Sequence, residues 1–182
     1  MGEFSSRCSA FVLAFLPLAA SQDAVERVGE LFGARRFDLA FEESRAIDDA
    51  ALRAEWEFQI LHEGGDLPGA LRAALRGLDG APAHLRLLHN AVVCSLTLGL
   101  GERSVELSQR WGRALESAEL SDDERRAQSQ VQRRMAHEAE ELLDRERAAA
   151  QAMGRARATS IALIALASCA VAALAFAPRR RR

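Results

Sequence analysis

The 182-residue sequence contains neither lysine nor tyrosine, and the lack of lysine alone excludes several kinds of site. Without lysine the chain has no phosphate-binding loop of the usual kind, no Schiff base and no serine–lysine pair. All 24 basic residues are therefore arginines, set against 26 acidic residues. Aromatic residues make up only 5% of the chain. Because strands prefer aromatic and β-branched residues, this composition predicts an all-α fold.

The few histidines and cysteines do not suggest a metal site or a catalytic site. His84 and His89 are five residues apart, whereas two metal-binding histidines on one helical face are four apart. Of the three cysteines, only Cys94 lies between the two apolar ends of the chain, so it has no partner there for a disulfide. We expect Cys94 to lie in the core. We also expect that the protein is not an enzyme and that it holds no cofactor or metal.

The C-terminal end is the most distinctive part of the chain. Residues 159–177 (TSIALIALASCAVAALAFA) carry no charge, and Pro178 and an arginine tail follow (Arg179, Arg180, Arg181 and Arg182). As a helix, this segment would span about 28 Å, close to the ~30 Å hydrocarbon core of a bilayer. Arginines beside a span mark its cytoplasmic side. The sequence therefore predicts a transmembrane helix at 159–177 and a cytoplasmic tail at 178–182.

A second apolar segment lies near the N-terminus. Arg7 precedes the segment CSAFVLAFLPLAA, which ends in small residues. A basic start, a short apolar centre and a small-residue exit are typical of a secretory signal peptide, which we predict at 1–21. An uncleaved anchor or a buried first helix is the alternative interpretation.

A signal peptide and a C-terminal stop-transfer segment together place residues 22–158 outside the cytoplasm. The whole chain has a net charge of −2; Glu3 and Arg7 cancel and the tail carries four arginines, which leaves −6 for residues 22–158. A domain this acidic is not expected to bind nucleic acid.

Apolar periodicity and helix-breaking residues predict six helices in residues 22–120. Asp66 is the expected N-cap of one of them, with Pro68 in its first turn, and no stretch alternates as a strand does. The expected helices are 23–34, 37–47, 49–62, 67–78, 83–98 and 102–115. Short connections between them predict antiparallel neighbours.

The spacing of small residues indicates an internal repeat. Gly65 and Gly99 are 34 residues apart, and each precedes small residues by five and nine positions (Ala70 and Ala74; Ser104 and Ser108). This pattern, with Pro82 between the copies, resembles the tetratricopeptide repeat, a 34-residue helix–turn–helix. Residues 37–40 resemble a degenerate first copy. The resemblance covers about residues 23–118 and implies three stacked helix pairs, with the large apolar side chains mainly in the core (Phe32, Trp56, Phe58, Leu61 and Trp111).

The resemblance also implies a binding surface. In this family the first helices of the pairs line a concave groove that takes a protein or peptide segment. The corresponding residues here are Glu55, Gln59, His62, Arg86, His89, Asn90 and Val93. The carboxylate clamp of some members is not expected, since only Arg86 and Asn90 resemble it. The alternative interpretation is that all these residues are simply polar surface.

Residues 121–158 differ in character from the repeats. A capping box at 121–124 starts a charged stretch that predicts one long helix. Its narrow apolar stripe (Ala127, Val131, Met135, Ala139 and Leu142) would pack on the last repeat or, alternatively, form a coiled coil with another chain. Small residues in 159–177 allow a homodimer through the membrane helix. A GC-rich coding sequence would explain the alanines equally well.

These features predict a membrane-anchored, extracytoplasmic adaptor that binds proteins. Two other interpretations remain open. One is a tail-anchored adaptor facing the cytosol, an arrangement that the mitochondrial fission adaptors resemble. The other is a structural stalk that self-associates through the helix of residues 121–157.

Overall fold

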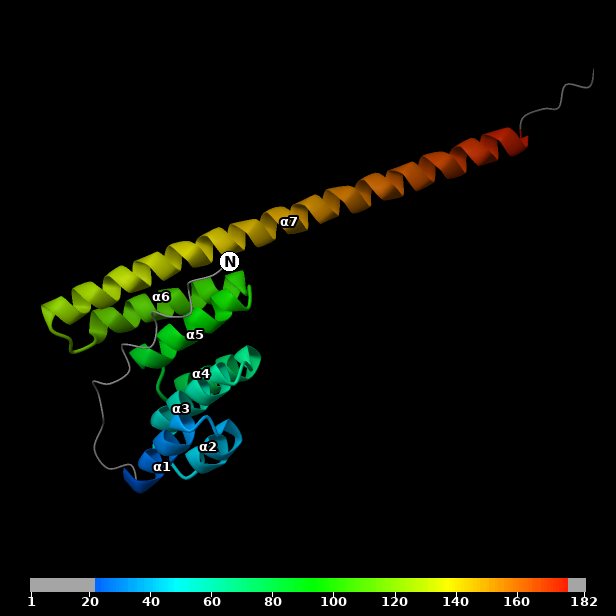
Figure 1. The fold of residues 1–182 in the computed structure, drawn as a ribbon. Helices are drawn as coiled ribbons and strands as arrows, with labels where there is room; N and C mark the ends of the chain where they lie inside the picture. Colours follow the sequence, from blue (N-terminus) through cyan, green and yellow to red (C-terminus); the bar gives the residue numbers. More distant parts are fainter. Residues whose placement is uncertain (1–21, 177–182) are drawn as a thin grey trace, which may run out of the picture. The chain divides into compact units, whose positions relative to one another are not determined.

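The computed structural model describes residues 22–176, with side chains for all of them except 158 and 162–176. Helices account for nearly all of this range, and no strand occurs within it, which confirms the all-α prediction. The elements, drawn in Figure 1, are α1 (Gln22–Gly33), α2 (Phe37–Ser44), α3 (Ala50–Glu63), α4 (Leu67–Gly80), α5 (Leu85–Thr97), α6 (Gly101–Ser117) and α7 (Asp122–Phe176). The predicted signal peptide and the arginine tail lie outside the described residues. The chain divides into two compact units, and the boundary lies between Cys94 and Ser95 in α5.

The same turn connects α1 to α2, α3 to α4 and α5 to α6. Within the described residues, a positive φ occurs only at Arg35 (58°), Gly65 (86°) and Gly99 (70°). The N–H of each of these residues donates to the carbonyl three positions back, and the next N–H donates to the carbonyl five positions back from itself. This is the hydrogen-bond pattern of a helix that ends in a left-handed residue. The next helix begins two residues later in every case.

The buried small residues also repeat with the turn. Five positions after the left-handed residue stand Ala40, Ala70 and Ser104, each fully buried. Nine positions after it stand Ser44, Ala74 and Ser108, exposed by at most 1%. The predicted spacing after Gly65 and Gly99 therefore also holds for the first pair, whose turn lies 30 rather than 34 residues before Gly65. Repetition inside the chain is thus a property of its fold.

The turns predict that one substitution stabilises the fold and that two others destabilise it. A left-handed conformation costs an L-residue about 1 kcal/mol more than glycine. We therefore expect Arg35→Gly to raise the free energy of unfolding by about 1 kcal/mol, and Gly65→Ala and Gly99→Ala to lower it by about the same amount. Urea unfolding of the chain in non-ionic detergent, followed by far-UV circular dichroism, measures all three. Equal effects of the three substitutions would contradict the assignment.

In the first unit, α1 packs on α2, α2 on α3, and α3 on α4. Val28, Ile47 and Ile60 lie in a buried cluster, against which Phe32 and Trp56 pack. These two rings meet edge to face, with centroids 6.0 Å apart. The prediction that the large apolar side chains serve the core is confirmed there, and Cys94 is also fully buried, as predicted.

In the second unit, α7 runs alongside α6 (Figure 1). Side chains of α7 cap both ends of α6. Arg125 donates from Nη1 to the carbonyl of Leu115 (2.8 Å) and from Nη2 to that of Ala118 (2.9 Å). At the other end, the N–H of Gly101 donates to Oε1 of Glu146 (3.2 Å). A cation at the C-terminus of α6 and an anion at its N-terminus both match the helix dipole.

The capping predictions hold at both helices concerned. Oδ1 of Asp66 accepts from the N–H of Gly69 (2.9 Å), with Pro68 in the first turn of α4. Ser121 and Glu124 exchange the two hydrogen bonds of the capping box. Along the predicted stripe of α7, Ala139 is buried and Val131, Met135 and Leu142 are half-buried. Ala127 is exposed, so the packing expected of the stripe does not extend to it.

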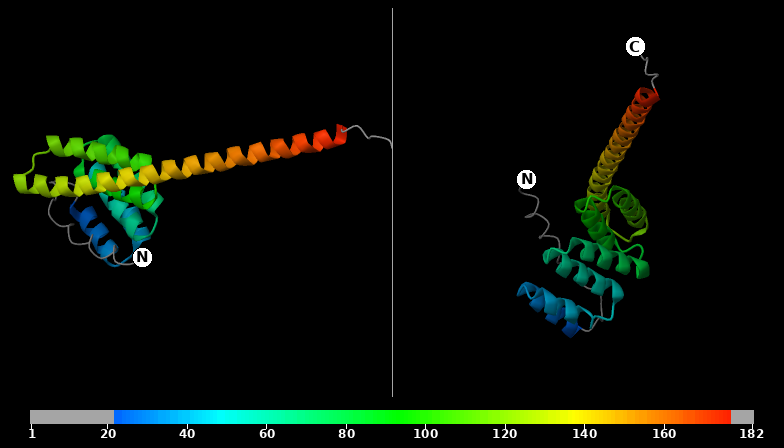
Figure 2. Two further views of the ribbon diagram at one scale, coloured as in Figure 1. Left: turned by 90° about the horizontal axis from the view of Figure 1, so that it is seen from above. Right: turned by 90° about the vertical axis from the view of Figure 1, so that its right-hand side faces the viewer.

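Helix α7 continues well beyond the part that packs on α6 (Figure 2). Residues 147–157 are all exposed. Judged on the described residues alone, no helix combines the length and the apolar character needed to cross a bilayer. The transmembrane helix at 159–177 therefore stays a prediction.

Candidate functional site

The predicted binding residues come from α3 and α5, and they differ in exposure. Glu55 is only 6% exposed. Gln59, His62, Arg86, His89, Asn90 and Val93 are all half-buried. The carboxylate of Glu55 faces α5 rather than solvent, and its role as a binding residue stays a prediction.

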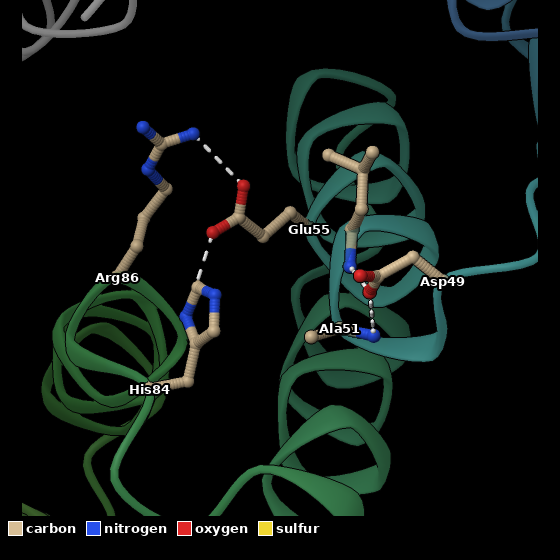
Figure 3. A network of polar contacts seen from close by, with 6 residues as sticks. Asp49, Ala51, Glu55, His84 and Arg86 are labelled. Carbon is tan, nitrogen blue, oxygen red and sulfur yellow. Dashed lines mark hydrogen bonds and ion pairs between the residues drawn. The ribbon is translucent and has the colours of Figure 1, made fainter. Parts of the chain in front are cut away.

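Glu55 is the centre of a polar contact between the two helices (Figure 3). Nη1 of Arg86 donates to Oε2 of Glu55 at 2.8 Å. Nδ1 of His84 lies 3.5 Å from Oε1, close enough for an ion pair when the ring is protonated. The same Nδ1 is buried and makes no hydrogen bond. Glu55 thus fixes Arg86, whose side chain keeps 33% of its surface exposed.

The local sequence explains the positions of Glu55, His84 and Arg86. Asp49 caps α3, its Oδ1 accepting from the N–H groups of Ala51 and Leu52 (Figure 3). Glu55 follows about one and a half turns later, and it is buried, as is its neighbour Ala54. His84 immediately precedes α5 and Arg86 is its second residue, so both side chains reach the same point of α3.

The burial of Glu55 changes its titration. Burial raises the pKa of its carboxyl above the ordinary value of 4.5, and the positive charge of Arg86, together with His84, opposes this change without cancelling it. The site therefore contains a carboxylate that is costly to ionise and is held by a guanidinium. Such a pair holds the side chain of Arg86 in a fixed orientation.

The other predicted binding residues are more exposed than Glu55. The ring of His62 stacks on Phe58, with centroids 5.5 Å apart. Burial lowers the pKa of His89 below 6.5, so this ring is neutral at physiological pH. Polar side chains and one oriented arginine are suited to hydrogen bonding with a protein segment. We use the name α3–α5 surface for Gln59, His62, Arg86 and Asn90.

Two features of the structure were not predicted from the sequence. His84 belongs to this site, but its partner Glu55 stands 29 positions earlier, and its spacing from His89 gives no sign of the contact. The other feature is a shallow hollow of about 550 Å³ in the second unit, which arises where α6 starts against the middle of α7 and has no local signal in the sequence. It is lined by Leu100, Glu102, Arg103, Glu106, Leu143, Glu146, Arg147 and Ala150.

Within the described range there is no cluster of three or more histidine, cysteine or acidic side chains able to hold a metal ion. Comparison with known proteins adds no identification: no family model matches the chain. A search of curated proteins likewise found no match.

The buried carboxylate gives a prediction about pH. Because the folded-state pKa of Glu55 lies above the unfolded-state value, folded protein holds the proton more tightly, and stability falls as pH rises from 4.5 through the folded-state pKa. We expect Glu55→Gln to remove this part of the pH dependence. Urea unfolding of both proteins across that range measures it, with Glu63→Gln, on the exposed end of α3, as the control. An unchanged profile in Glu55→Gln would contradict the assignment.

Proposed function

We propose that this protein is a membrane-anchored adaptor, whose helical domain binds a segment of another protein on the α3–α5 surface. The observation that carries the proposal is the threefold turn with its buried small residues. A chain built of repeated helix pairs presents corresponding side chains at regular intervals, and such surfaces suit extended or helical peptides. The tetratricopeptide resemblance of the sequence supports the same conclusion.

The chemistry of the surface defines the partner further. Arg86 is held by Glu55 with a third of its side chain exposed, and Gln59 and Asn90 supply amide donors and acceptors. These groups favour a partner segment with backbone carbonyls or a carboxylate side chain. They do not supply the several free cations that a nucleic acid needs.

Anchoring rests on the sequence of the C-terminal segment. Residues 159–177 carry no charge, and α7 leads into them without a break up to Phe176. We propose that the helical domain lies outside the cytoplasm, delivered by the N-terminal apolar segment.

The opposite orientation has one observation in its favour. Four arginines precede the uncharged segment within about 15 residues (Arg145, Arg147, Arg155 and Arg157), as many as follow it. The arginines are therefore balanced around the uncharged segment, and our proposed orientation rests on the N-terminal segment. A reporter fused after Arg182 tests this: activity on the cytoplasmic side supports our orientation, and activity on the far side supports a tail-anchored adaptor.

Site-specific photo-crosslinking tests the binding proposal. A photoreactive residue at Gln59 or Asn90 should capture a discrete partner in native membranes, and Arg86→Glu should abolish the capture because it reverses the oriented charge. The control places the same group at Asp79, an exposed residue of α4. Equal capture from all three positions would contradict a binding surface between α3 and α5.

A further inference from the structure

The charge of α7 changes sign at the point where its packing on α6 ends. Residues 122–146 hold eight acidic residues and five arginines, which gives −3. Residues 147–176 hold three arginines and no acid, which gives +3. Glu146, the last acidic residue of the chain, is also the group that caps the first residue of α6. The packed part of α7 is thus acidic and its free part is purely basic.

The three arginines differ in distance from the uncharged segment. Along a helix, Arg155 and Arg157 lie about 6 Å and 3 Å before Thr159, whereas Arg147 lies about 18 Å before it. All three are exposed. Arg147 lines the hollow together with Glu102, Glu106 and Glu146, whereas Arg155 and Arg157 lie nine and eleven residues beyond Glu146, the last acidic residue. If the uncharged segment enters a bilayer, Arg155 and Arg157 are at the depth of the lipid headgroups, and their side chains reach outward to them.

We propose that Arg155 and Arg157 form a binding site for the phosphates of anionic lipids, on the side of the membrane where the helical domain lies. This inference rests on the proposed membrane anchor and adds the class of lipid that the anchor prefers. Charge complementarity selects this partner, because a second copy of the same basic segment would be repelled. Arg147 lies beyond the Debye length of about 8 Å and contributes little.

The test uses the full chain reconstituted into phosphatidylcholine vesicles, with spin-labelled phosphatidylglycerol or spin-labelled phosphatidylcholine as the probe. The measured quantity is the preference of the protein-contacting lipid layer for phosphatidylglycerol. Because the arginine tail also attracts anionic lipid, the result is read from the change in this preference that the substitution causes. We expect Arg155→Gln with Arg157→Gln to lower the preference by about fivefold per arginine, and added salt to weaken it.

Two matched variants complete the design. Arg133→Gln with Arg134→Gln removes the same charge from exposed positions on the packed part of α7 and should leave the preference unchanged. Arg147→Gln should change it little. An unaltered preference in the Arg155 and Arg157 variant, or an equal loss in the Arg133 and Arg134 variant, overturns the lipid site while the anchor stands. A chain that does not enter vesicles of either lipid overturns the anchor and this site together.

Discussion

Trp111→Ala is expected to lower the free energy of unfolding by about 4 kcal/mol, because removal of so large a buried side chain leaves a cavity. Trp111 is fully buried in α6. It stands twelve positions after the left-handed Gly99, as Ile47 does after Arg35 and Gly77 after Gly65. Ile47 is also fully buried, and a Cβ added to Gly77 would lie 2.5 Å from Cβ of Ala54. The position twelve residues after each left-handed residue is therefore closely packed, whether it holds tryptophan, isoleucine or glycine.

Urea unfolding in detergent measures this loss. The control is Leu39→Ala, a large apolar residue that is 44% exposed, for which we expect a loss below about 0.5 kcal/mol. A small effect of Trp111→Ala would mean that α6 is not packed as described.

Gly101→Ala is expected to lower the free energy of unfolding by about 2 kcal/mol and to loosen α6 from α7. An added Cβ would lie 2.8 Å from Cα and 2.9 Å from N of Leu143, and backbone atoms cannot move aside as the end of a side chain can. The substitution also displaces Glu146, whose Oε2 would lie 2.5 Å from the new carbon. The first N–H of α6 then loses its acceptor.

The matched control is Gly154→Ala in the free part of α7. Nothing lies within 4 Å of a Cβ added there, so the substitution should favour the helix by about 1 kcal/mol. Amide hydrogen exchange distinguishes the two variants. Faster exchange along α6 in Gly101→Ala, and slower exchange around residue 154 in Gly154→Ala, is the expected result; similar profiles would contradict the close contact at Leu143.

Local signals in the sequence were sufficient to predict most helices. Glycine, proline and capping residues act within a few positions, so the start of α4 at Leu67 and the turn at Gly99 follow from them. The first turn was harder, because Arg35 occupies a conformation that usually marks glycine. The end of α2 was placed three residues late, at Ile47 instead of Ser44. Ile47 is buried although it lies beyond the helix, so burial there does not indicate helix.

The candidate site depended on contacts that are distant in sequence. Glu55 has the polarity of a surface residue, and only Arg86, 31 positions later, shows that it is buried and paired. The contact face of α7 was predicted from apolar residues alone. Its closest contacts to α6 also include polar ones, Arg125 and Glu146, because helix ends need hydrogen-bond partners as well as apolar packing.

The central claim is that a helical-repeat domain is held at a membrane by residues 159–177. Alkaline carbonate extraction of membranes tests it most directly, with the full chain compared to a chain that ends at Arg157. We predict that the full chain stays in the membrane pellet and that the shortened chain is released. Release of both chains would contradict the claim.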